Sequence, residues 1–408
     1  PRFASGYVCA YSALVMKFFG DRERRVVRVM ARECKILTLR PLYIFCMVIA
    51  PLFCDIFFTT LMRDGLPKDL PAGVVDLDRS SLSRSIQRNL DAFAQTGVSA
   101  NYSTVKEARE AMQRGETYGY FYIPENFSKD VQAFRQPRIS FYSNYSYLIA
   151  GSLLFRDMKT ISELTSGAAM RSQLYARGAS ERSAMAYLQP IVVESHAVNN
   201  PWLNYSIYLS NLLLPGVLSL LILMVTVTAI GMEIKYGRVE EWLQVSGDSM
   251  AVALVGKLLP HTVIFTLMGV FYNVYLYGFL HFPCHSGILP MLVATFVLVL
   301  ASQSLGVFMI GVFPSLRLGL SFASLWGVLS LSIAGFSFPV LAMPDAVQVA
   351  SNLFPLRHYY LLYVAQALNG YGMIYGWAHY LGLLLFMLLP FLIGRRLHNA
   401  LYHYKYIP

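Results

Sequence analysis

A short run near the middle of the chain combines acidic and apolar residues in a way that could transmit force from a cytosolic partner. The run GMEIKYGRVEEWLQVSGDS places Glu240 and Glu241 directly before Trp242 and Leu243. A short helix with this sequence would be acidic on one side and apolar on the other, at the face of a membrane. A plain solvated loop is the alternative, but it would expose Trp242 and Leu243 to water without need.

Two polar residues inside apolar runs are candidates for lining a path through a membrane. Asp55 lies about two-thirds of the way through the run 41–62, and ionisable residues inside a membrane span are costly and usually functional. Asp55 could equally lie near the outer interface and be solvated there. Gln303 is a second candidate, although hydrogen bonding between helices is the commoner use of such a residue.

Other constellations that could do chemistry are weak or absent from the sequence. His281, Cys284 and His285 form a compact trio, but zinc requires a fourth ligand or water, so we expect no metal site. The sequence contains no phosphate-binding Gly-Xaa4-Gly-Lys-Ser/Thr loop, no Gly-Xaa-Ser-Xaa-Gly and no His-Glu-Xaa-Xaa-His. We expect no catalytic residue and no cofactor in this chain, so that if its work were driven by ATP, a separate chain would have to bind the ATP and Mg²⁺.

The composition indicates that much of the surface does not face water. The 408 residues are 56% hydrophobic and only 14% charged, whereas a soluble domain has about a quarter of its residues charged. Charges are frequent in 63–200 but absent from 205–230, 289–313 and 376–394. The net charge of +10 does not indicate a nucleic-acid partner, because the basic residues cluster beside apolar runs as in membrane proteins.

Several apolar runs are long enough to cross a bilayer, which requires about 20 residues in a helix. We expect spans at 41–62, 205–230, 252–278, 288–312, 319–339 and 374–394. The run DRERRVVRVMARECKILTLR before the first span alternates apolar residues with Arg and Lys. This pattern favours a basic amphipathic helix on the cytoplasmic leaflet over an ordinary solvated helix.

Between the first and second spans the sequence predicts a compact α/β domain, because strand and helix patterns alternate there. Strands are expected at 71–78, 98–104, 117–124, 138–146 and 190–198, and helices at 81–93, 105–115, 128–136 and 147–189. None of the five cysteines lies in this insert, which excludes a disulfide framework within it.

The links between the spans predict the orientation. Lys and Arg occur in the links 231–250 and 313–318 and after the last span, whereas 279–287 has none and 340–373 has only Arg357. Under the positive-inside rule both termini are cytoplasmic and the α/β insert is outside. The sequence begins at Pro1, so its true start can lie upstream, and no cleavable signal peptide is expected.

The run after the second span resembles a family motif. Glu-Xaa-Lys-Xaa-Gly followed by Glu-Glu-Xaa-Leu is similar to the signature of ATP-binding-cassette exporter permeases of the second type, where it forms the coupling helix that docks on the ATPase. The resemblance assigns ATPase coupling to Glu233, Lys235, Gly237, Glu240, Glu241 and Leu243. Arg238 departs from the small hydroxyl residue that is common in the family.

A second stretch, GFSFPVLAMPDAVQVASNLFPLRHYY, resembles the family's segment after the fifth helix, where the chain dips partly back into the membrane. The residues that carry this likeness are Pro339, Met343, Pro344, Gln348 and Pro355. Prolines break helices, and broken helices at membrane depth must pack on protein or line a cavity. A proline-rich external loop is the alternative. Arg32-Glu33, Pro41-Leu42 and Ala50-Pro51-Leu52 also resemble the family's connecting helix and first span.

The resemblance implies a polytopic α-helical membrane protein with six transmembrane helices and an inserted extracytoplasmic α/β domain. It places the chain in the subgroup that has a large external domain after the first helix. The expected parts are an N-terminal cytoplasmic or interfacial segment 1–40, a first helix 41–62, an external domain 63–203, five further helices within 204–396, and a cytoplasmic tail 397–408. The region 204–396 would include the coupling helix 232–246 and the helix-broken external segment 338–360.

The implied function is a permease of the bacterial inner membrane that exports an amphipathic or hydrophobic substrate, such as a drug or lipid, by alternating access. Its implied partners are a cytosolic ATPase, a second permease copy or paralogue, membrane lipids, and in many members a periplasmic adaptor with an outer-membrane channel. A membrane-anchored scaffold or receptor is the main alternative, but it would need neither the acidic segment nor the proline-broken region. A membrane enzyme would need a catalytic set, and a secondary transporter more intramembrane charge than Asp55.

Overall fold

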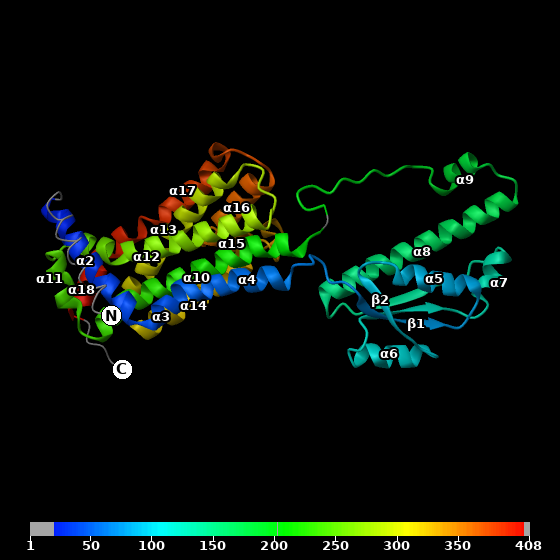
Figure 1. The fold of residues 1–408 in the computed structure, drawn as a ribbon, viewed down its shortest axis with the longest axis horizontal. Coiled ribbons are helices and arrows are strands. Elements are labelled where there is room, and N and C mark those ends of the chain that lie inside the picture. Colours follow the sequence, from blue (N-terminus) through cyan, green and yellow to red (C-terminus); the bar gives the residue numbers. More distant parts are fainter. Residues whose placement is uncertain (1–19, 202, 404–408) are drawn as a thin grey trace. The chain divides into compact units, whose positions relative to one another are not determined.

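The computed structural model describes residues 20–201 and 203–403, which fold into two compact units. One unit is Asp64–Tyr205, and the other joins Pro1–Arg63 to Ser206–Pro408. The expected N-terminal segment and C-terminal tail lie partly outside the described residues, at 1–19 and 404–408. Figure 1 labels many of the elements of both units.

The larger unit is helical, and its described residues include six helices long and apolar enough to cross a membrane. They are Pro41–Leu61 (α3 Pro41–Ile44, η1 Phe45–Ile49 and α4 Ala50–Leu61), Tyr205–Lys235 (α10), Met250–Phe279 (α12 Met250–Asn273 and η2 Val274–Phe279), Ile288–Val312 (α13), Leu316–Ile333 (α14) and Met373–Tyr402 (η5 Met373–Gly376, α17 Trp377–Phe386 and α18 Leu389–His403). Each overlaps one expected run, so the six expected runs are confirmed as helices that are candidates for membrane spans. The second and last helices continue beyond the apolar runs, because helix formation does not end where charge begins.

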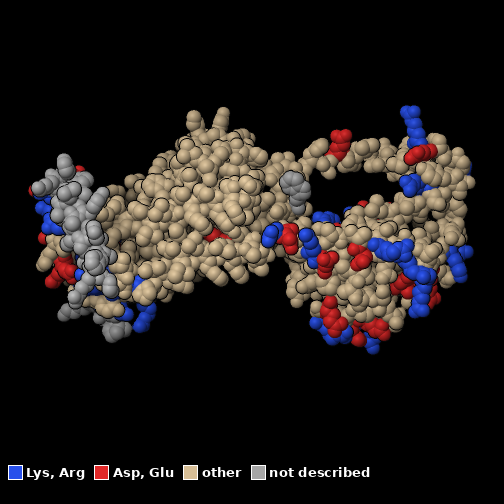
Figure 2. Space-filling model, in the orientation of Figure 1, with Lys and Arg blue, Asp and Glu red and all other residues tan. Residues whose placement is uncertain are grey.

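Charged residues on this unit gather at one end. In the view of Figure 2, the surface of the helical unit is nearly bare of Lys, Arg, Asp and Glu over most of its length, and charges collect near α2 and α11. A water-soluble bundle would carry charge along its whole exposed surface. The bare surface is therefore suited to lipid.

Shorter helices join or precede the spans. The helix α2 covers Asp21–Leu39 and α11 covers Val239–Ser246. The helix expected at 21–40 is thus confirmed, whereas its place on a lipid leaflet stays a prediction. After α14 the chain forms η3 (Val340–Ala342), α15 (Asp345–Ser351), α16 (Pro355–Tyr363) and η4 (Val364–Leu368).

The smaller unit is built around a four-stranded sheet in the order β2-β1-β3-β4. Its elements are β1 (Leu70–Asp76), α5 (Ser81–Asp91), β2 (Thr96–Asn101), α6 (Val105–Gln113), β3 (Gly119–Ile123), α7 (Phe127–Gln132), β4 (Ser140–Ser143), α8 (Leu148–Ala176) and α9 (Glu181–Leu188). The strand β1 pairs in parallel with β2 and β3, and β3 pairs antiparallel with β4. Parallel neighbours require crossover helices, which α5 and α6 provide.

Helices cover both faces of this sheet. Side chains of α5, α7 and the first half of α8 enclose one core with Phe121 and Ile123, and Ala108 of α6 packs with Val75 and Tyr120 on the other face (Figure 1). The helix starts are set by side-chain caps: Ser80 accepts from Ser83 N (3.1 Å) before α5, and Thr104 accepts from Glu107 N (3.2 Å) before α6.

Two sequence expectations differ from this unit. The strand expected at 190–198 is wrong, since residues 189–200 contain no strand. A half-buried strand needs a partner edge and one covered face, but Ile191, Val192 and Val193 are consecutively 75%, 74% and 77% exposed. The helix expected at 147–189 is interrupted between α8 and α9, where Gly178 takes a positive φ of 84° that ends a helix readily.

Candidate functional site

The helix α2 lies against α12 along a narrow stripe. Val29, Glu33 and Leu37 are its buried residues, and their spacing of four places them on one face of the helix. Gly256 of α12 permits the close approach, because a Cβ there would lie 2.7 Å from Val29 Cβ and 2.9 Å from the carbonyl oxygen of Val26. The buried stripe of α2 therefore faces protein.

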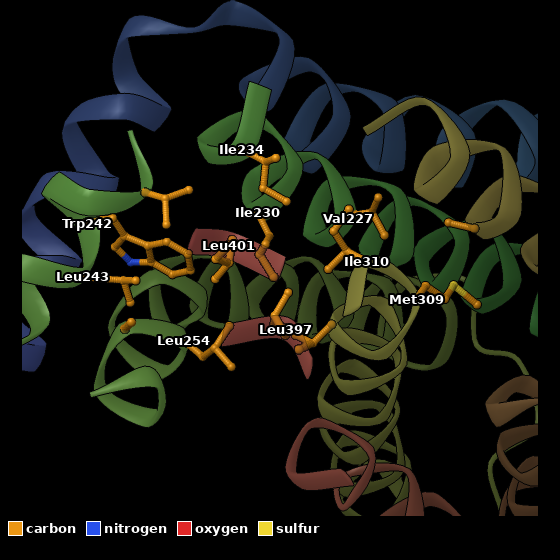
Figure 3. Close-up of a cluster of buried hydrophobic side chains, with 14 of the residues drawn as sticks. Val227, Ile230, Ile234, Trp242, Leu243, Leu254, Met309, Ile310, Leu397 and Leu401 are labelled. Atoms are coloured by element: carbon orange, nitrogen blue, oxygen red, sulfur yellow. The ribbon is translucent and has the colours of Figure 1, made fainter. Parts of the chain in front are cut away.

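The helix α11 is bounded by two glycines in left-handed backbone conformations. Gly237 precedes it with φ 63°, and Gly247 ends it with φ 67°, a conformation that glycine adopts without a Cβ penalty. Between them Trp242 and Leu243 are fully buried. Figure 3 shows the side chain of Trp242 pointing into a cluster of buried apolar residues from α10, α12 and α18, namely Ile230, Ile234, Leu254, Leu397 and Leu401.

A buried charge network joins these helices. Lys257 Nζ of α12 donates to Glu33 Oε2 at 2.6 Å and to Glu233 Oε1 at 2.8 Å. His261, one turn further along α12, places Nε2 3.0 Å from Glu33 Oε1. The side chains of Glu33, Glu233, Lys257 and His261 are each at most 2% exposed, so these contacts form away from water.

Arg32 extends the network toward the surface. Its guanidinium donates to both carboxylate oxygens of Glu233, at 2.8 and 3.0 Å, and through Nε to Glu241 Oε1 at 3.2 Å. Bidentate pairs of this kind add geometric specificity to charge. Arg32 is 14% exposed and Glu241 62% exposed. These contacts form a charge network, which consists of Arg32, Glu33, Glu233, Lys257 and His261. The network links α2, α10 and α12, and it reaches α11 through Glu241.

The charges of the network compensate one another. Burial alone would raise the pKa of Glu33, but the hydrogen bond with His261 and the charge of Lys257 outweigh it and hold that pKa below its ordinary value. The hydrogen bond to Glu233 raises the pKa of Arg32 above its ordinary value. Lys257 Nζ also lies 5.2 Å from the ring centre of Trp242, within the range of a cation–π contact. Removing one member would leave a buried charge without its partner.

The residues assigned to ATPase coupling are only partly brought together. Glu233 is buried in the last turn of α10, and Leu243 is buried in α11. Glu240 and Glu241 lie in the first turn of α11 and are exposed, as are Lys235 and Gly237. Arg32 bridges Glu233 to Glu241, so those two carboxylates belong to one contact set. The coupling role itself stays a prediction.

The proline-containing stretch after α14 consists of short helices. Pro339 precedes η3, Pro344 precedes α15, and Pro355 is the first residue of α16. Gln348 Nε2 donates to the carbonyl oxygen of Met343 at 2.9 Å, which closes the turn before α15. Each proline therefore lies at a helix start, where its missing N–H is not needed for a helical hydrogen bond. The external, re-entrant placement stays a prediction.

The two path-lining candidates lie among the helices of this unit. Asp55 is 5% exposed and borders a cavity of about 10 Å³ that is also lined by Leu214, Met268 and Tyr272. Such a cavity is no larger than one water molecule requires. Gln303 Oε1 of α13 accepts from Thr262 Oγ1 of α12 at 2.7 Å, which is a hydrogen bond between helices. A role for either residue in a transport path stays a prediction.

Sequence reasoning missed Lys257 and the role of His261. Lys257 is the one Lys, Arg, Asp or Glu between Met250 and Phe279, and a lone charge inside an apolar run signals a buried partner. His261 follows it by four residues, on the same helix face. Within the described part of the chain, no group of three or more His, Cys, Asp or Glu side chains could hold a metal ion.

The comparisons with known proteins agree with this architecture. The family model described as ABC-2 family transporter protein matches residues 41–396. No curated protein matches the chain. Because the family match spans most of the sequence, the chain belongs to the ABC-2 family of transporter proteins.

Proposed function

We propose that this chain is the permease subunit of an ATP-driven exporter, with its ATPase docked on the end formed by α2 and α11. The observation that carries the proposal is the charge network, which ties the exposed Glu241 at the start of α11 to Lys257 inside the third span. A docking helix must be connected rigidly to the spans that it moves. The packing of the buried Trp242 and the bidentate Arg32–Glu233 ion pair provide such a rigid connection.

In this mechanism, ATP and Mg²⁺ bind to the partner ATPase. Movement of the ATPase displaces α11 and α2, and the charge network passes that displacement to α10 and α12. The spans then alternate between inward-facing and outward-facing arrangements, driven by the different affinities of the ATPase for its nucleotides in those two states. The network suits this role because its members come from three helices but share buried carboxylates.

A second copy, or a paralogue, would complete the transport path. The first, fifth and sixth candidate spans have only 22%, 28% and 17% of the residues in their most apolar windows buried, against 67% for the second and fourth. The exposed faces of α4 and α14 are therefore available to lipid or to a second permease. A path between such apolar faces favours an amphipathic or hydrophobic substrate, drug-like or lipid-like, exported from the cytoplasm or the inner leaflet.

The distribution of Lys and Arg supports cytoplasmic termini in a bacterial inner membrane. The unit Asp64–Tyr205 would then be external, where it could meet a periplasmic adaptor and an outer-membrane channel. Its surface carries interspersed acidic and basic residues, as Figure 2 shows, which suits a water-facing unit. The scaffold alternative is not favoured, because it gives no reason for a charge network that links α11 to the spans.

The test is a pull-down of the tagged chain from native membranes in a mild detergent, followed by mass spectrometry. We expect a partner ATPase with a phosphate-binding loop, and we expect its recovery to fall when Glu240→Lys and Glu241→Lys are combined. The matched control combines Glu110→Lys and Glu125→Lys, which make the same charge change at exposed positions of the smaller unit. Recovery of the chain without any ATPase, under conditions that preserve a known exporter complex, would favour the scaffold.

A further inference from the structure

The smaller unit contains an open groove of about 670 Å³. One wall is the second half of α8, and the other is α7 with the loop that leads to β4. Its lining residues come from the start of α5, from α7 and the segment 134–140 that follows it, and from α8 between Ser162 and Gln173. A volume of this size is typical of a site for one small molecule.

Contacts across the groove hold its two walls together. Gln173 Nε2 of α8 donates to the carbonyl oxygen of Val131 in α7 at 3.0 Å. The guanidinium carbon of Arg177 lies 4.7 Å from the ring centre of Phe134. Beneath them, Phe127 is 3% exposed and belongs to the core of the unit. The groove is therefore preformed, which reduces the entropic cost of binding a ligand.

The groove combines an apolar lining with positive charge. Arg135 and Arg138 are its charged residues, and no Asp or Glu is among those that line it. Arg135 Nη1 lies 3.3 Å from Asp130 Oδ1 in an exposed ion pair, which is a weak interaction. Arg138 forms no ion pair within the described part of the chain. The hydroxyl-bearing Thr165 and Ser166 add polar positions on the wall formed by α8.

We propose that this groove binds a single-chain anionic amphiphile, such as a fatty acid or an alkyl phosphate. The carboxylate or phosphate would lie against Arg135 and Arg138, since guanidinium groups match planar and tetrahedral oxyanions. The alkyl chain would lie along the apolar lining residues Leu82, Val131 and Met170. The site is contained within Asp64–Tyr205, so its existence does not depend on the exporter function.

The experiment uses the full chain in nanodiscs of zwitterionic lipid and a fatty acid that carries a photoreactive diazirine in its chain. After irradiation and digestion, mass spectrometry locates the label. We expect labelled peptides from 127–140 and 162–173, with labelling suppressed by dodecyl phosphate and not by dodecyltrimethylammonium. Arg135→Glu combined with Arg138→Glu should reduce labelling there by roughly tenfold or more, as loss of charged hydrogen bonds predicts.

Two further variants make the result decisive. Arg109→Glu reverses an exposed charge on α6, which lies on the other face of the sheet, and should leave labelling unchanged. Ala169→Trp should fill the groove and abolish labelling while the charges remain. Equal labelling of the wild type and the double arginine variant, equal competition by the cationic amphiphile, or labelling confined to the spans would overturn the proposal. So would a co-purifying protein that cross-links to 127–140 and excludes the fatty acid.

Discussion

The ammonium group of Lys257 in α12 lies 2.6 Å from a carboxylate oxygen of Glu33 in α2, although the two residues are 224 positions apart. Both side chains are 1% exposed, and Glu233 shares the same ammonium at 2.8 Å. Two charged groups are held in a low-dielectric interior only when their partners are well placed. The contact therefore fixes α2 against the third candidate span.

Lys257→Met should destabilise the protein, because it leaves Glu33 and Glu233 buried without their shared cation. Breaking a buried ion pair typically lowers the free energy of unfolding by about 3–5 kcal/mol. Glu233 keeps its contact with Arg32 and Glu33 keeps its contact with His261, so we expect a loss near the low end of this range. The measurement is the apparent melting temperature of the detergent-solubilised chain by size-exclusion chromatography after heating.

The same substitution at the exposed Lys235 serves as the matched control and should change the melting temperature little. Adding Glu33→Gln to Lys257→Met should restore part of the loss, since the buried negative charge is then removed. Additive losses in the double variant would show that the two residues do not act as a pair.

Gly256→Ala tests the close approach of α2 to α12. The added Cβ would lie 2.7 Å from Val29 Cβ and 2.9 Å from a backbone oxygen, so one helix must shift. Overpacking of this kind lowers the free energy of unfolding by about 1–3 kcal/mol. This loss exceeds the stabilisation of about 0.5–1 kcal/mol that comes from replacing a glycine within a helix by alanine. We expect a lower melting temperature and faster proteolysis at α2.

Gly167→Ala is the control for that prediction. Gly167 lies within α8, and a Cβ there meets nothing within 4 Å. The substitution should therefore be neutral or slightly stabilising. If Gly256→Ala raised the melting temperature as Gly167→Ala is expected to do, the packing of α2 on α12 would be looser than the structure indicates.

Much of the fold could be predicted from sequence because its signals are local. The spans follow from apolar runs, and the strands β1 to β4 follow from short β-branched and aromatic segments between turn residues. The segment 190–198 carries the same β-branched signal in Ile191, Val192 and Val193, but it forms no strand. A strand depends on a partner edge that is distant in sequence, and propensity alone cannot supply one.

The charge network could be predicted only in part, for a similar reason. Glu233 and Glu241 lie in a recognisable motif, so their segment could be found. Lys257 stands alone in an apolar run, and its partner Glu33 is separated from it by the whole smaller unit. Sequence can show that such a lysine needs a counter-ion, but the choice among distant acidic residues depends on how the helices pack.

The pH dependence of stability should report on Glu33. Its pKa in the folded protein is below the ordinary value of 4.5, so the ionised form contributes stability that is fully present above that value. This contribution is lost as the pH falls below 4.5 through the folded pKa. We expect the melting temperature of the wild type to fall more steeply than that of Glu33→Gln in this range. Parallel curves for the two proteins between pH 3 and 7 would contradict the assignment.

Trp242→Ala separates docking from coupling. Trp242 is fully buried, packs beside Leu243 in the cluster of Figure 3, and lies under the ammonium of Lys257. Truncation should lower the free energy of unfolding by about 3–5 kcal/mol. It should loosen the packing of α11 but leave Glu240 and Glu241 available to dock. Trp242→Phe keeps an aromatic ring beneath the ammonium of Lys257 and should be affected much less.

The informative measurement is made on the complex with its ATPase, comparing ATPase recovery with transport driven by ATP. If α11 must be joined stiffly to the spans, Trp242→Ala should reduce transport more than it reduces recovery of the ATPase, because the acidic residues of α11 can still dock. Combining Glu240→Lys with Glu241→Lys should reduce both measures together. Equal effects of Trp242→Ala on docking and transport would mean that α11 serves only as an attachment point, and force would then have to reach the spans through α2.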